Sequence, residues 1–141
     1  MHRAILKPYT VYSRSVSDPV LWTNGLFLVN SIIWLHVGSL AACLATTWAA
    51  VTSIFYHKTM ERNPLAHLLD RTAAVAALLI TVGVSAQALT VLEWMVVSAF
   101  LLLGLALKSH AHKKGEIYDG WHTAWHVCVF AGQAILALAH V

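Results

Sequence analysis

The sequence predicts an all-α integral membrane protein, a helical bundle of about five transmembrane helices with a cytoplasmic N-terminus. Hydrophobic residues make up 59% of the 141 residues and charged residues only 11%, a composition that soluble domains rarely have. The apolar residues also form long runs, and every Lys and Arg falls on one side of the membrane when these runs are assigned to five spans. We therefore expect a cytoplasmic N-terminal segment, 1–19, followed by a single transmembrane domain, 20–141.

The first two spans come from one long apolar stretch, 20–57. As a single helix this stretch would be about 57 Å long, against a hydrocarbon core of about 30 Å. It must therefore fold back on itself, and the Gly and Ser residues of 36–39 make that segment the expected turn. The first span is then 20–36, entered through Ser17-Asp18-Pro19, and the second is 40–57.

The three later spans are delimited by polar residues. Asn63-Pro64 provides an N-cap and a proline at the first helical position of the third span. Ser85-Ala86-Gln87 is the expected turn after it, and 108–119 is expected to be a basic loop that contains histidines. The sequence thus predicts spans at 64–84, 89–107 and 120–141.

The basic residues give the orientation of this five-span arrangement. None lies in the two turns at 36–39 and 85–88 or at the C-terminus, and all nine lie on the N-terminal side. Because cytoplasmic loops carry an excess of Lys and Arg, the N-terminus is expected in the cytoplasm and the C-terminus on the far side. These residues are Arg3, Lys7, Arg14, Lys58, Arg62, Arg71, Lys108, Lys113 and Lys114.

Composition also argues against several classes of protein. The net charge of +3 could favour nucleic acid, but the basic residues are distributed as topology signals, so no nucleic-acid partner is expected. Cys43 and Cys128 both lie inside apolar segments and are expected to be small core residues, not a disulfide framework. The N-terminus has no pattern typical of a removable signal peptide.

Five polar residues are expected at one depth near the cytoplasmic face. Ser53 and His57 are one helical turn apart at the end of the second span, Asp70 lies about two turns into the third, and His122 and His126 are one turn apart at the start of the last. Polar side chains in a bilayer are costly and usually functional. Their convergence predicts a site built by three helices.

This set of residue types favours a catalytic zinc centre. Three imidazoles with an open fourth position bind Zn²⁺ together with a water whose pKa falls toward about 7. Asp70 could hold and deprotonate that water or orient a histidine ligand. Ser53 could donate a hydrogen bond to the oxyanion that forms when water adds to a carbonyl. The predicted chemistry is metal-assisted hydrolysis of an amide or ester bond in a membrane lipid.

These motifs resemble the CREST superfamily, which includes the alkaline ceramidases, the adiponectin and progestin receptors with their hemolysin III relatives, and the Per1-like proteins. The resemblance rests on Ser53-Ile-Phe-Tyr-His57, on Leu68-Leu-Asp70, and on His122-Thr-Ala-Trp-His126-Val-Cys-Val-Phe-Ala-Gly132. It implies that His57, His122 and His126 bind zinc and that Asp70 and Ser53 contact the metal-bound water. The chain would be a shortened member, since the family usually has seven spans, and it has Arg71 where the hemolysin-like branch often has His.

Two other functions remain as alternatives. One is a non-catalytic receptor or structural protein whose zinc only joins helices, and the other is a haem-binding membrane protein, which normally takes its axial ligands from opposing helices. A homo-oligomer is an alternative to a single-chain bundle. Two further polar residues are not assigned to the site. His67 is either an interfacial residue or a partner of Asp70, and the Glu93 side chain can reach the far interface. Trp125 could help to shape the site.

Overall fold

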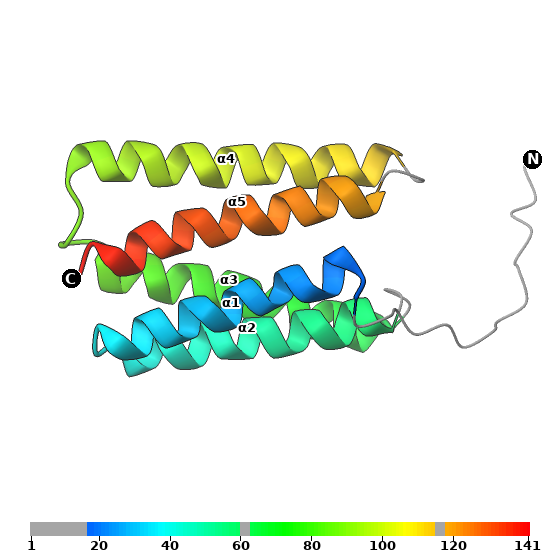
Figure 1. The fold of residues 1–141 in the computed structure, drawn as a ribbon, viewed down its shortest axis with the longest axis horizontal. Coiled ribbons are helices and arrows are strands. Elements are labelled where there is room, and N and C mark those ends of the chain that lie inside the picture. The colour runs from blue at the N-terminus through cyan, green and yellow to red at the C-terminus, as the bar shows by residue number, and fades with distance from the viewer. Residues whose placement is uncertain (1–16, 60–62, 115–117) are drawn as a thin grey trace, which may run out of the picture.

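Five helices make up the described part of the chain, which in this computed structural model comprises residues 17–59, 63–114 and 118–141. They are α1 (Pro19–His36), α2 (Leu40–Lys58), α3 (Pro64–Ser85), α4 (Val91–Lys114) and α5 (Tyr118–Leu138). Successive helices run in opposite directions (Figure 1). The predicted all-α bundle is confirmed, whereas most of the expected N-terminal segment, 1–19, lies outside the described residues.

Side-chain caps begin the first three helices where the sequence predicts. The Asp18 carboxylate accepts a hydrogen bond from the Val20 amide at 2.9 Å, and the Asn63 side chain accepts from the first turn of α3 at 3.0 and 3.1 Å. A proline follows each of these caps. Between α1 and α2 the chain reverses at Gly38, whose φ of 84° suits a residue without a Cβ atom. Local chemistry thus sets these helix starts.

The fourth helix differs from the prediction at both ends. Thr90 and Glu93 form a capping box, in which Glu93 accepts from the Thr90 amide at 2.7 Å and Thr90 accepts from the Glu93 amide at 3.4 Å. At its other end α4 continues to Lys114, so the expected loop at 108–119 is wrong at 108–114, and it is also wrong at 118–119, where α5 begins. The segment 108–114 contains no Gly or Pro that would break a helix. The helix therefore continues beyond the end of the apolar run.

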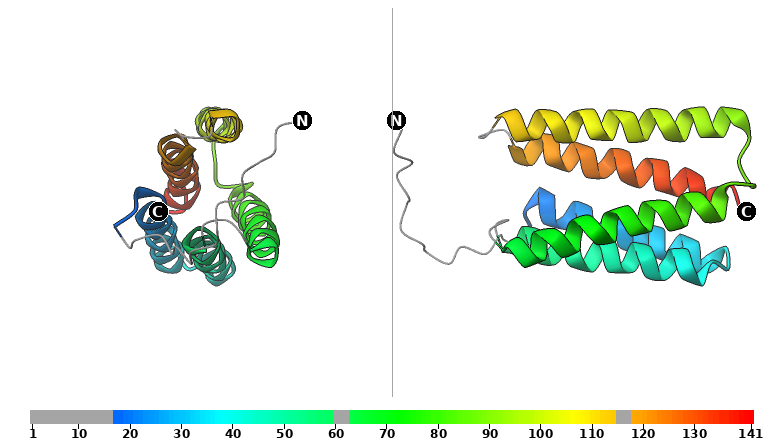
Figure 2. Two further views of the ribbon diagram at one scale, coloured as in Figure 1. Left: turned by 90° about the vertical axis from the view of Figure 1, so that its right-hand side faces the viewer. Right: turned by 180° about the vertical axis from the view of Figure 1, so that it is seen from behind.

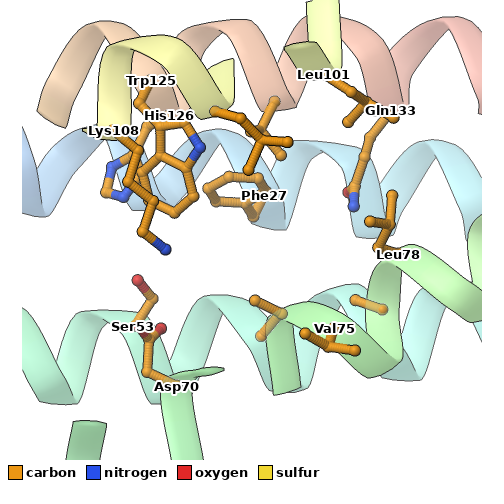
Figure 3. A pocket seen from close by; sticks show the side chains of 15 residues that line it. Phe27, Ser53, Asp70, Val75, Leu78, Leu101, Lys108, Trp125, His126 and Gln133 are labelled. Atoms are coloured by element: carbon orange, nitrogen blue, oxygen red, sulfur yellow. The ribbon is translucent and has the colours of Figure 1, made fainter. Parts of the chain in front are cut away.

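The helices form an open ring. Viewed from one end, they follow the order α4, α5, α1, α2, α3 (Figure 2), and neighbours in this order pack together as far as α3. Within the described residues α4 packs only against α5, and α3 and α4 do not pack against each other. Side chains of α3 and α4 instead line opposite sides of a cavity (Figure 3).

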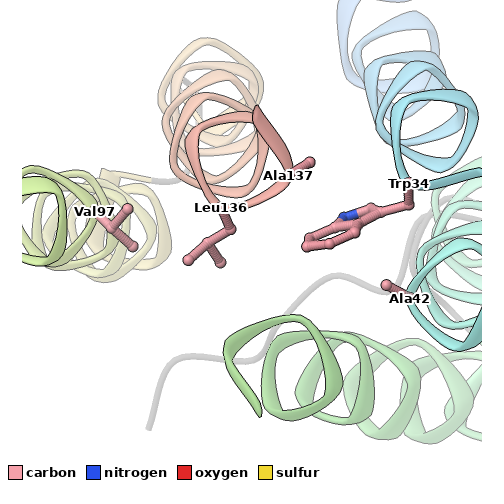
Figure 4. Close-up of a cluster of buried hydrophobic side chains, with 5 residues drawn as sticks. All are labelled: Trp34, Ala42, Val97, Leu136 and Ala137. Atoms are coloured by element: carbon pink, nitrogen blue, oxygen red, sulfur yellow. The ribbon is translucent and has the colours of Figure 1, made fainter. Parts of the chain in front are cut away.

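The hydrophobic core lies toward the end of the bundle where α1 ends and α2 begins. Its members come from α1, α2, α4 and α5 and meet around the buried indole of Trp34 (Figure 4). Apolar side chains are also exposed on the outside of the bundle, with Ile32, Leu79 and Leu102 each 66–67% exposed. The buried cluster comprises Trp34, Ala42, Val97, Leu136 and Ala137.

Three helices are long and apolar enough to cross a membrane: α2, α3 and the 91–110 part of α4. With the exposed apolar surface, this indicates a membrane protein. The other two helices, α1 and α5, have amide side chains on their buried faces, Asn24 and Asn30 in α1 and Gln133 in α5.

Candidate metal centre

Three histidines meet inside the bundle at the end where α2 finishes and α5 begins. His57 comes from the last turn of α2, and His122 and His126 from the first turns of α5. All three are buried, with exposed fractions of 1%, 3% and 0%. The predicted convergence of these residues is therefore confirmed.

The spacing of the histidines fits ligands of a single metal ion. One ring nitrogen from each histidine can be chosen so that all three lie within 4.8 Å of one another. The Nε2 atoms of His57 and His122 are 3.1 Å apart. Two nitrogen ligands at about 2.0–2.1 Å from one tetrahedral ion would lie about 3.3 Å apart, which is close to this distance. The three histidines could therefore hold a metal ion.

The tautomer of His126 is assigned from its hydrogen bond to Thr23. The Thr23 hydroxyl has one hydrogen, and its shortest contact is with the Pro19 carbonyl oxygen, at 2.7 Å, so the hydroxyl donates there. The same oxygen lies 3.1 Å from Nδ1 of His126, where it must therefore accept. His126 thus carries its proton on Nδ1 and has a lone pair on Nε2.

That lone pair has no partner. The Nε2 atom of His126 is buried and makes no hydrogen bond to any described residue. A buried acceptor without a partner costs roughly 1–3 kcal/mol. A metal ion shared with the other two histidines would satisfy it, so the site's own chemistry fits a cation.

Aromatic rings enclose the histidines. The Phe27 ring meets His126 edge-on with the ring centroids 5.8 Å apart, and the Trp125 ring lies 4.8 Å from His126 and 5.0 Å from His122. Trp125 therefore shapes the site, one of the roles considered for it from sequence. Such packing keeps the imidazoles in fixed rotamers and limits the access of water.

Asp70 and Ser53 lie beside the histidines and not among them. Both line the cavity that His126 also lines, and the Ser53 hydroxyl faces the Asp70 carboxylate (Figure 3). Neither belongs to the group of potential metal ligands. They therefore lie on the wall of the cavity next to the histidines.

Lys108 of α4 reaches into the cavity from the opposite side. Its ammonium group lies 4.4 Å from the centroid of the Trp125 ring, a cation–π arrangement. It points across the cavity toward Ser53 and Asp70 (Figure 3). The cavity end next to the histidines thus carries a carboxylate, a hydroxyl and an ammonium group on different helices.

The cavity itself is mostly apolar. Its volume is about 290 Å³, near the lower limit for sites that bind small molecules. From the metal centre it extends between α3 and α4 to Leu78, Leu101 and Gln133. On α5 its lining residues run from Trp125 to Gln133, about 12 Å along the helix axis.

Sequence reasoning missed three residues of this region: Thr23, Lys108 and Gln133. Thr23 and Gln133 lie on helices whose rotation about their own axes cannot be read from the sequence with certainty, although polar residues at helical spacing in an apolar span were a usable signal. Lys108 was missed because it was assigned to a loop.

Among the described residues, His36, His67, His110, His140 and Glu93 lie outside the group of three histidines. His67 lines a small second pocket together with Asp70 and Tyr56, and its ring centroid is 5.0 Å from that of Tyr56. His110 contacts Trp121, with ring centroids 4.7 Å apart. Glu93 caps α4.

Comparisons of the chain with protein-family models, with curated proteins and with solved structures found no match.

Proposed function

We propose that this protein is a zinc-dependent intramembrane hydrolase that cleaves an amide or ester bond of a membrane lipid. The observation that carries the proposal is the buried, unpartnered Nε2 lone pair of His126, which lies among two further buried histidines. A neutral imidazole with its other nitrogen held by a hydrogen bond is the usual form of a histidine ligand to zinc.

Zinc would be held by His57, His122 and His126. When bound, it would supply Lewis-acid chemistry that activates water and polarises a carbonyl group. Three protein ligands are typical of catalytic zinc sites, which keep a fourth position open, whereas structural sites usually have four.

The residues next to the centre have roles in this proposal. Asp70 acts as a general base that orients and deprotonates the attacking water, because its carboxylate lines the same cavity as His126. Ser53 donates a hydrogen bond to the developing oxyanion. Lys108 adds positive charge on the opposite wall, where it can also stabilise that oxyanion.

A lipid substrate is supported by the cavity. Its walls are mostly apolar, and it lies between α3 and α4, which do not pack against each other within the described residues. An acyl chain could enter it from the bilayer with its carbonyl group next to the metal centre. The resemblance to the CREST superfamily in Ser53–His57, Leu68–Asp70 and His122–Gly132 supports the same reading, and the proposal makes the chain a shortened member.

The proposed topology has five spans with the N-terminus in the cytoplasm. Lys58, Arg71 and Lys108 all lie toward the end of the bundle that carries the histidines. By the positive-inside rule this end faces the cytoplasm, so the metal centre would lie near the cytoplasmic face.

Metal analysis tests the proposal. Detergent-purified wild type is expected to contain about one zinc per chain, His122→Ala to lose it, and Asp70→Ala to keep it. His110→Ala, which changes a histidine outside the centre, is the matched control and should also keep it. Preparations with zinc are then incubated with lipid amides and esters, and product release is measured.

Two results would count against the proposal in different ways. A wild type that holds no zinc, even after zinc is supplied, would contradict the metal centre. Stoichiometric zinc without Asp70-dependent turnover of any lipid amide or ester would favour a non-catalytic protein in which the metal only joins α2 to α5.

A further inference from the structure

Gln133 is the one polar side chain at the far end of the cavity. The other polar or charged groups that line it, Ser53, Asp70, Lys108 and His126 with the neighbouring Trp125, gather next to the metal centre. Gln133 follows His126 by seven residues on α5 and therefore lies about 10 Å farther along the helix axis. Its carboxamide points into the cavity near Leu78 and Leu101 (Figure 3).

The amide oxygen of Gln133 is buried and has no hydrogen-bond partner among the described residues. The residue is only 4% exposed, and its Oε1 atom makes no hydrogen bond to any described residue. Exchanging the oxygen and nitrogen of the amide would leave a buried N–H group in the same position, so the deficit does not depend on how the amide is oriented. An unpaired amide is costly in an apolar environment.

The cavity side chains next to Gln133 do not pair with its amide oxygen. Leu78 and Leu101 offer no hydrogen-bonding group. A hydrogen-bonding group on a molecule inside the cavity could therefore supply the partner.

We propose that the cavity binds a lipid chain that carries a hydrogen-bonding group of the hydroxyl class partway along its length, and that Gln133 recognises this group. A hydroxyl can donate to the amide oxygen and accept from the amide nitrogen, so it matches either face of the carboxamide. This inference rests on the proposed function, because it specifies the lipid that the hydrolase would take. It narrows the substrate class from acyl lipids in general to those with an oxygenated chain.

Binding of fatty acids to metal-stripped protein tests the inference without the reaction. Chelator-treated protein in detergent is loaded with radiolabelled stearate, which is then displaced by unlabelled stearate or by hydroxystearates that carry the hydroxyl at successive carbons. The series is run on wild type, Gln133→Leu and Gln87→Leu. Gln87, the other glutamine of the chain, lies in the turn after α3 and is exposed, so it is the matched control.

For each variant, the preference for a hydroxystearate over stearate is expressed as the ratio of their affinities, and these ratios are compared between variants. Hydroxystearates partition into micelles less strongly than stearate, but this difference is the same for every variant and cancels when variants are compared. For at least one hydroxyl position, the preference over stearate should be about three- to tenfold greater in wild type and Gln87→Leu than in Gln133→Leu, the range expected for one net hydrogen bond. Gln133→Met, which keeps the chain length without the amide, replaces Gln133→Leu if the latter does not fold.

Equal preferences in wild type and Gln133→Leu at every hydroxyl position would overturn the inference, because the hydroxyl of the ligand would then form no hydrogen bond with the amide. Absence of any stearate displacement would overturn it as well, since the cavity would not hold a lipid chain. Zinc content is measured on separate untreated samples of the same proteins. If the untreated wild type contains no zinc, the result counts against the proposed function. A preference for hydroxystearate that depends on Gln133 would still support the inferred binding of an oxygenated chain in the cavity.

Discussion

At the scale of single residues, the candidate metal centre includes a hydroxyl group from a helix that supplies no potential ligand. Thr23 of α1 accepts a hydrogen bond from the Nδ1–H group of His126 and so leaves Nε2 as the atom that can bind a cation. The partner lies 103 positions away in the sequence. Groups that hold histidine ligands in one tautomer typically influence metal affinity as strongly as many ligands do.

We expect Thr23→Val to weaken zinc binding about 10- to 100-fold, because the His126 ring is no longer held in one tautomer and orientation. Competition with a chromogenic chelator measures the dissociation constant. Thr47→Val is the matched control, since the Thr47 hydroxyl donates to the Cys43 carbonyl of its own helix at 2.8 Å. Equal affinities in the two variants would show that Thr23 does not support the ligand.

The substitution Asp70→Asn distinguishes a role in catalysis from a role in metal binding. The amide has almost the same shape but cannot take a proton from water, so turnover of a lipid substrate should fall about 10²- to 10⁴-fold. Zinc content should not change, because Asp70 is outside the group of potential ligands. Full activity in Asp70→Asn, measured by release of the fatty acid, would exclude the carboxylate as general base.

At the scale of helices, glycines face the contact between α4 and α5. A Cβ atom on Gly104 would lie 3.2 Å from the Trp125 ring and 3.3 Å from Val129. On the other side of the contact, a Cβ atom on Gly132 would lie 3.4 Å from Phe100. Small residues of this kind let membrane helices approach closely.

Gly104→Leu should therefore separate α4 from α5 and destabilise the protein by about 1–3 kcal/mol, the usual cost of overpacking. The midpoint of thermal unfolding in detergent measures the effect. Gly83→Leu is the control, because no atom lies within 4 Å of a Cβ atom at Gly83. If both variants unfold at the same temperature, the contact does not limit stability.

The helix ends show which parts of the fold can be predicted from sequence. The bounds of α1, α2 and α3 agree with the expected spans within one residue, because Asp18 and Asn63 with their prolines signal helix starts locally. The predicted end of α4 was wrong, because hydropathy marks the edge of an apolar run and not the last backbone hydrogen bond of the helix. The meeting of His57, His122 and His126 at one end of the bundle was predictable from the direction of each span. The partners of these residues were not, because they depend on how the helices rotate and pack.

At the scale of the whole molecule, the bundle separates a polar end from an apolar end. The histidines lie where α2 ends and α5 begins, and the core around Trp34 lies toward the other end. In the proposed topology the polar end is cytoplasmic.

Reporter fusions test this topology. Alkaline phosphatase, which folds only outside the cytoplasm, should be active when fused after Val141 and inactive when fused after Lys58. A green fluorescent protein fused at the same two positions should give the opposite pattern. Activity of alkaline phosphatase at Lys58 would contradict both the orientation and the cytoplasmic location of the metal centre.

The missing contact between α3 and α4 has a kinetic consequence for the proposed hydrolase. If the substrate reaches the cavity sideways between these helices, it never passes through water, and the concentration that governs the rate is its mole fraction in the bilayer. Diluting the substrate with inert lipid should then slow the reaction even when the total amount of substrate per volume of solution is constant. The two-dimensional density of the lipid, set by the composition of the host membrane, would determine how fast this protein works.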